Sequence, residues 1–95
     1  MFTIIRTDGT EEVHGERPTM AIVRAAIGAP ALDTVRIGRA NTPPDDQIML
    51  VDDTGALRDL SVNAKATALY HAVCKPGNPH QIHGDVVVTY DRYFV

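Results

Sequence analysis

A length of 95 residues suits one domain and leaves no room for two, and a domain of this size buries only a small core. Hydrophobic residues make up 44% and charged residues 22%, which argues against wholesale disorder. The net charge is −3, and no stretch of the sequence is strongly basic. Residues 41–62 carry five Asp against one Arg, and in the flanking parts positive and negative charges are nearly balanced. A nucleic-acid-binding surface is therefore not expected.

Cysteine usage and the apolar runs indicate the compartment. Cys74 is the single cysteine, so no internal disulfide is expected, as in a reducing compartment. The stretch from Met1 to Arg6 is charged too soon for a signal peptide, and no apolar run approaches the roughly 20 residues that span a bilayer. We expect a cytoplasmic protein without a membrane partner.

The first expected elements form a hairpin. Residues 2–6 are apolar and β-branched, which favours a strand. Asp8-Gly9 is a turn signal, because both residues tolerate positive φ. Residues 10–14 are short and acidic, which is typical of an exposed edge strand.

A helix is predicted next. Pro18 suits its first position, because the missing N–H would have no partner there. Met20, Val23 and Ile27 follow at spacings of three and four, which places them on one face. Gly28 marks the end of this helix.

Two or three strands follow the first helix. Alternating residues of the range 32–39 point to the two faces of a sheet. Residues 47–51 are apolar on both faces, which is typical of an inner strand. Residues 52–55 are expected to form a turn that leads into a short strand over residues 56–60.

The last predicted elements are a helix and a strand. Asn63 suits an N-cap, because its side-chain oxygen can accept from an early helical N–H. Residues 64–73 are then helical, and residues 85–90 form a strand whose three consecutive valines indicate burial in the middle of a sheet. One stripe of the helix holds Ala66, Leu69 and Val73.

Together these elements predict a single α+β domain over residues 1–95, in the order ββαββαβ. We expect a mixed sheet of four to five strands with two helices. The order is that of a β-grasp (ubiquitin-like) domain, in which the last strand lies centrally beside the first. A ferredoxin-like or another α+β sheet is the alternative.

Two stretches carry a family resemblance. Residues 51–70 read VDDTGALRDLSVNAKATALY, and residues 82–88 read IHGDVVV. Together they resemble an uncharacterised family of small proteins encoded by bacteriophages and bacteria, especially actinobacteria and their phages. The resemblance implies a phage or mobile-element accessory protein, in the host cytoplasm if phage-encoded, and it supplies no catalytic residue.

Two pairs of residues are candidates for a ligand or a partner. Asn63 and Thr67 belong to the family-like pattern, and the β-branched Thr67 is the least explained residue of its helix. Arg36 and Arg39 flank Gly38 and, with Arg6 nearby, could receive a phosphate or a carboxylate. Solvated or ion-paired strand ends are the alternative.

A third candidate contact lies at the aromatic residues Tyr93 and Phe94. With Val95 they would form an apolar end, and aromatic residues are enriched at interface cores. A homodimer through this end is one prediction. The other is that Phe94 folds back near Tyr70.

The side chains of His71, Cys74, His80 and His83 are of types that bind zinc. However, the pairs lack the usual knuckle turn, and Cys74 at a helix end is more often a small core residue. We therefore expect no metal, no cofactor and no catalytic residue. A small zinc-dependent or Cys/His enzyme is the alternative.

The function expected from these observations is that of a non-enzymatic binding module, which acts through contact with an unknown protein or small ligand. The alternative within this class is capture of a nucleotide-type host signal. Stoichiometric zinc in protein purified without a histidine tag would instead favour the enzyme.

Overall fold

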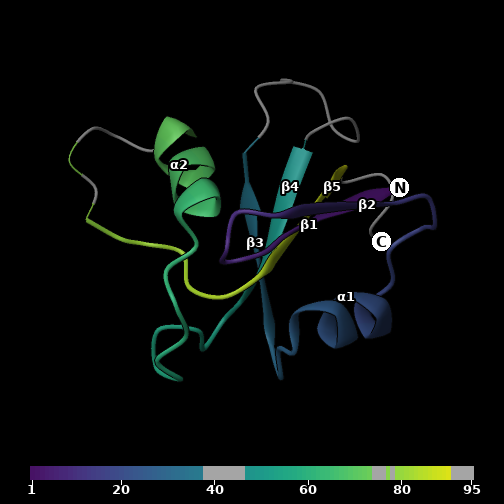
Figure 1. The fold of residues 1–95 in the computed structure, drawn as a ribbon, viewed down its shortest axis with the longest axis horizontal. Helices are drawn as coiled ribbons and strands as arrows, with labels where there is room; N and C mark the ends of the chain where they lie inside the picture. The colour runs from purple at the N-terminus through teal and green to yellow at the C-terminus, as the bar shows by residue number, and fades with distance from the viewer. Residues whose placement is uncertain (38–46, 74–76, 78, 91–95) are drawn as a thin grey trace.

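The computed structural model describes residues 1–37, 47–73, 77 and 79–90. Its elements are labelled in Figure 1 as β1 (Phe2–Ile5), β2 (Glu11–His14), α1 (Met20–Ile27), β3 (Leu32–Arg36), β4 (Gln47–Asp52), α2 (Ala64–Val73) and β5 (Val86–Tyr90). The predicted α+β class and the order ββαββαβ are confirmed. Neither helix of the described part of the chain is long and apolar enough to cross a membrane.

The strands form one sheet in the order β2-β1-β5-β4-β3. As predicted, the last strand lies beside the first and in the middle of the sheet. The expected mixture of parallel and antiparallel pairs is not found in the described part of the chain, where every strand pair is antiparallel. The β1–β5 pair thus differs from that of a β-grasp domain, in which these strands are parallel. The sequence could not decide this, since a run of valines is buried whichever way its strand points.

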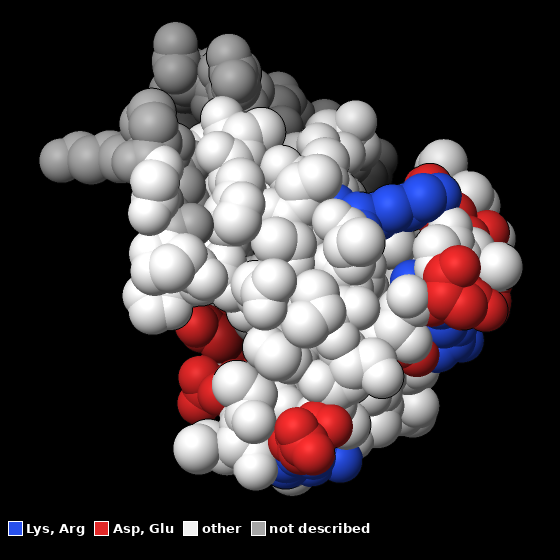
Figure 2. Space-filling view, turned by 60° about the vertical axis from the view of Figure 1, so that its left-hand side comes forward, with Lys and Arg blue, Asp and Glu red and all other residues white. Residues whose placement is uncertain are grey.

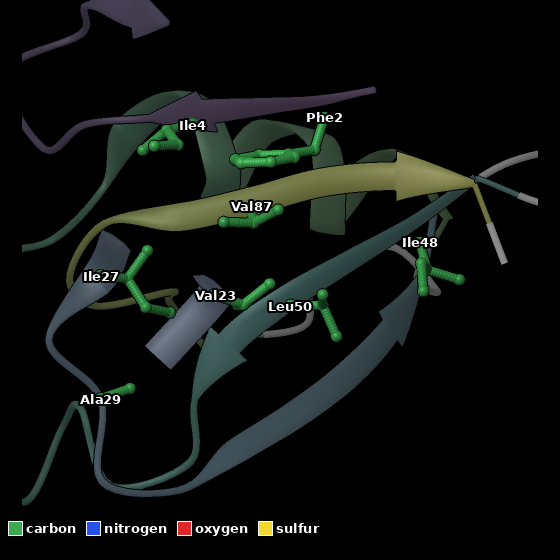
Figure 3. Close-up of a cluster of buried hydrophobic side chains, with 8 residues drawn as sticks. All are labelled: Phe2, Ile4, Val23, Ile27, Ala29, Ile48, Leu50 and Val87. Atoms are coloured by element: carbon green, nitrogen blue, oxygen red, sulfur yellow. The ribbon is translucent and has the colours of Figure 1, made fainter. Parts of the chain in front are cut away.

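The two helices cover opposite faces of the sheet, as Figure 1 shows. On one face, Val23 and Ile27 of α1 pack into the cluster drawn in Figure 3, with side chains from β1, β4 and β5. On the other face, Ala66 and Tyr70 of α2 pack on a second cluster from the same three strands. β4 and β5 are therefore buried on both faces, which explains their continuous apolar runs.

The N-terminus of α1 differs from the prediction by two positions, because the first helical residue is Met20 and not Pro18. Thr19 is the N-cap, and its hydroxyl accepts from the Ile22 N–H at 3.2 Å, so Pro18 precedes the helix instead of opening it. The predicted face is confirmed at Val23 and Ile27, whereas Met20 in the first turn is half exposed. Gly28 ends the helix, as predicted, at a φ of 64° that favours glycine.

Residues 56–60 do not form the predicted strand. Their backbone hydrogen bonds are local: the Arg58 N–H donates to Thr54 O, and the Leu60 N–H donates to Gly55 O. A strand would need these groups for a neighbour in the sheet. The segment is a series of turns that stands beside the end of β4.

The second helix has its predicted bounds but shows a different buried stripe. Ala66 is buried and Tyr70, four residues later, packs beside it. Leu69 and Val73, which the sequence places on one stripe with Ala66, are each more than a third exposed. Periodicity indicates that a helix has an apolar stripe, but it does not fix which residues of that stripe contact the sheet.

Candidate functional site

Asn63 is the N-cap of α2, as predicted, and it also joins two other segments. Its Oδ1 accepts from the Ala66 N–H at 3.1 Å. Its Nδ2 donates to Ile5 O at 2.9 Å and to Gly84 O at 3.0 Å. The residue has 0% exposed surface, so a ligand could contact it only after rearrangement. Asn63 therefore fixes the start of α2 against β1 and the approach to β5.

Thr67 also binds backbone rather than lying open on the surface. Its Oγ1 accepts from the Ile82 N–H at 3.0 Å and lies 3.5 Å from Ile82 O. This bond ties the segment 79–84 to α2. It explains a β-branched residue within the helix, because the hydroxyl satisfies a backbone group of a loop. Thr67 thus shapes the lining of the pocket described below without being part of it.

Arg6 belongs to an ion-pair network at the end of β1. Its guanidinium donates to Glu12 at 2.7 Å and to Asp85 at 2.9 Å. The hydrogen bond from Arg6 holds the pKa of the Glu12 carboxyl below its usual range. Asp85 also accepts from the Thr7 N–H at 2.9 Å, so the network joins β1, β2 and the start of β5. These contacts are structural.

The predicted arginine cluster does not include Arg6. Arg36 is opposite Ile48, which in turn is opposite Thr89 near the end of β5. Arg6 instead contacts Asp85, before β5 begins, so the two arginines lie toward opposite ends of the sheet. Arg39 lies outside the described residues. The expected grouping failed because it assumed a pairing of strands that local sequence does not reveal.

Two histidines of the zinc alternative, His71 and His83, contact backbone oxygens. His71 Nε2 lies 2.6 Å from His80 O, and His83 Nδ1 lies 2.8 Å from Leu60 O. Since a carbonyl only accepts, each of these nitrogens is the donor, and neutral His83 keeps an acceptor at Nε2. Among the described residues no three His, Cys, Asp or Glu side chains gather as metal ligands. Cys74 lies outside the described residues.

A pocket of about 390 Å³ lies between the β3–β4 end of the sheet, α2 and the segment 79–84. Such a volume falls at the low end of small-molecule sites and suits a small ligand or one side chain. Its charged lining residues are all aspartates. The lining consists of Asp33, Val35, Val51, Asp52, Asp53, Gly55, Ala56, Tyr70, His80, Gln81, Ile82 and His83.

The three aspartates of the pocket differ in their surroundings. Asp52 is buried and forms an ion pair with Arg58, while its Oδ1 accepts from the Thr54 N–H at 2.8 Å. Asp33 and Asp53 are exposed, and neither has an ion pair within the described residues. Asp33 Oδ1 accepts only a backbone bond, from the Thr34 N–H at 2.9 Å. Two carboxylates of the pocket therefore have no ion pair with a described Lys or Arg.

The surface beside the pocket carries little charge. Figure 2 brings the α2 side forward and shows a broad area without charged side chains, with acidic and basic ones at its edge. In sequence, α2 and residues 79–84 contain one charged residue, Lys65. Lys65 forms an ion pair with Glu11, so within α2 and residues 79–84 no described cation pairs with Asp33 or Asp53.

Gly55 makes the wall of the pocket possible, which gives a test of the local packing. A Cβ at this position would lie 2.8 Å from His83 O, a backbone atom that cannot move without the segment 79–84. We expect Gly55→Ala to lower the free energy of unfolding by about 1–3 kcal/mol, as overpacking does. Gly15→Ala is the control, because a Cβ there meets nothing within 4 Å. Urea denaturation of both variants measures the difference, and equal stabilities would contradict this packing.

Sequence reasoning missed Asp33 and Asp53 as site residues. It treated Asp53 as part of a turn and Asp33 as a strand residue, and both descriptions are correct locally.

Tyr93 and Phe94 lie outside the described residues, so the contact predicted for them stays a prediction. The chain matches no family model, no curated protein and no solved structure, and the family resemblance of residues 51–70 and 82–88 likewise stays a prediction.

Proposed function

We propose that the protein is a binding module that receives a protonated amine or guanidinium group in the pocket beside α2. The observation that carries this proposal is the pocket's lining. Among the described residues, Asp33 and Asp53 offer two carboxylates without ion pairs, Tyr70 offers an aromatic ring, and no Lys or Arg lines the pocket. Carboxylates with an aromatic ring are a combination that attracts organic cations.

The same lining disfavours the nucleotide-type ligand considered from the sequence. A phosphate is bound by Arg, Lys or a row of backbone N–H groups, and it is repelled by carboxylates. Arg58, the basic residue that pairs with Asp52, is outside the lining. A cation therefore fits this pocket better than an anion does.

The lining also supports binding rather than turnover. Its described residues include no Ser, Thr, Cys or Lys, and its Asp carboxylates serve to attract the cation. His83 donates to Leu60 O, a bond that orients the ring as part of the wall. The proposal is accordingly a non-enzymatic contact, either with a small cation or with a basic side chain of a protein.

Titration with lysine amide and arginine amide, followed by amide chemical shifts, tests the proposal. We expect shifts centred on residues 33–35, 53–56 and 80–83, with dissociation constants on the order of millimolar, since exposed ion pairs and cation–π contacts each contribute only about 1 kcal/mol or less. The double variant Asp33→Asn/Asp53→Asn should bind at least about tenfold more weakly. Asn at position 33 keeps the acceptor for the Thr34 N–H.

Asp59→Asn is the matched control. Asp59 is exposed, lies outside the pocket lining and has a φ of 56°, which Asn tolerates. It should leave the affinity for the amides within twofold. If Asp59→Asn weakened the binding of the amides as much as the double variant does, the effect would come from net charge alone and the proposal would be wrong. Tighter binding of adenosine monophosphate than of either amide would also overturn the proposal.

A further inference from the structure

We infer that the cation is a Lys or Arg side chain of an extended peptide, which adds to the sheet as a sixth strand along β3. The inference rests on the proposed function and specifies its ligand. β3 is an edge strand, with β4 as its neighbour in the sheet. An exposed edge offers its backbone groups to another chain, and side-chain pockets beside it supply specificity.

The hydrogen bonds between β3 and β4 show which backbone N–H and C=O groups of β3 face away from β4. Ile37 N–H donates to Gln47 O, and Asp53 N–H donates to Ala31 O. In an antiparallel pair, every second residue forms hydrogen bonds with the neighbouring strand. The backbone groups of residues 31, 33, 35 and 37 therefore face β4. Those of residues 32 and 34 point away from β4, toward the position of an added strand.

The side chains of β3 place the pocket within reach of such a peptide. Asp33 and Val35 both line the pocket, because alternate residues of a strand share one face. A peptide residue opposite Asp33 would project its side chain to the same face. Directly opposed Cβ atoms are about 4.5–5.5 Å apart, which is a suitable distance for an ion pair between the two side chains.

Asp33 couples the backbone contact to the charge contact. Its Oδ1 accepts from the Thr34 N–H, one of the groups that point away from β4. A peptide carbonyl would take over this N–H, and the Asp33 carboxylate would then be released toward the peptide's cation. Pairing with the edge and binding of the basic side chain therefore favour each other.

The test compares lysine amide with the capped peptide acetyl-Thr-Val-Lys-Val-Thr-amide. We expect the peptide to bind about tenfold more tightly, because two or more backbone bonds add to the ion pair. With Lys opposite Asp33 in an antiparallel strand, like every pair of this sheet, the two valine amides face β3 and the lysine amide faces away. N-methylation of both valines should abolish the gain, and N-methylation of the lysine should preserve it.

Two variants of the protein complete the test. Thr34→Pro removes the outward N–H at an edge position where proline is tolerated. It should remove the advantage of the peptide and leave the affinity for lysine amide within twofold. Thr34→Val keeps the N–H and should behave as the unmodified chain.

The outcomes separate the inference from the proposed function. If lysine amide binds and the peptide binds no more tightly, the strand addition is wrong and the cation pocket stands. If neither binds, both are wrong. If Thr34→Pro retains the full tenfold gain, the peptide contacts another part of the surface and the inference is overturned.

Discussion

The Val87→Asp variant is expected not to fold. Val87 has 0% exposed surface and lies on the central strand, opposite Ile4 of β1 and Leu50 of β4. An aspartate there would bury a charge without a partner in the apolar cluster of Figure 3, at a cost of several kcal/mol. Small domains are stable by only about 5–15 kcal/mol, so the variant should show the circular dichroism and amide dispersion of an unfolded chain.

Val13→Asp is the matched control for this variant. It makes the same substitution on the edge strand β2, where Val13 is 65% exposed. Its free energy of unfolding should stay within about 0.5 kcal/mol of that of the original chain. A soluble Val87→Asp protein with an unchanged melting temperature would contradict the central place of β5.

The second large effect is expected at Asn63. Asn63→Ala removes the helix cap and leaves the Ile5 and Gly84 carbonyls without their side-chain donor. The cap is worth about 1 kcal/mol, and buried groups that lose a partner cost about 1–3 kcal/mol. We therefore expect a loss of about 3 kcal/mol in urea denaturation.

Two further variants separate the cap from the amide donors. Asn63→Asp keeps an acceptor for the Ala66 N–H but turns an oxygen toward both carbonyls, so it should be at least as unstable as Asn63→Ala. Thr19→Ala removes a simple cap, that of α1, and should cost only about 1 kcal/mol. An Asn63→Asp variant as stable as the original chain would show that the Nδ2 bonds contribute nothing.

Local patterns predicted the elements well because their causes are local. The valine run of β5, the Asn63 cap and Gly28 each act through their own segment, and the structure confirms all three. The expected strand over residues 56–60 is wrong, because five residues that mix apolar and charged side chains carry no clear period, and their backbone groups bond locally.

The pocket could not be predicted, because its parts meet only through the fold. Asp33 and Asp53 come together with Tyr70 and His83 through the β3–β4 pairing and the Thr67 bond. A single sequence gives neither the strand directions nor the face that each helix covers. The second role of Asn63, as a donor to Ile5 and Gly84, was hidden for the same reason.

The position of β5 between β1 and β4 governs how the sheet can assemble. β1–β2 and β3–β4 are pairs of neighbours in sequence, whereas the contact of Ile4 with Val87 spans almost the whole chain. Two separate hairpins can thus form early, and the strand that unites them is synthesised after all the other elements. Closing such distant contacts is slow, so the apolar edges of β1 and β4 stay open to mispairing until β5 inserts.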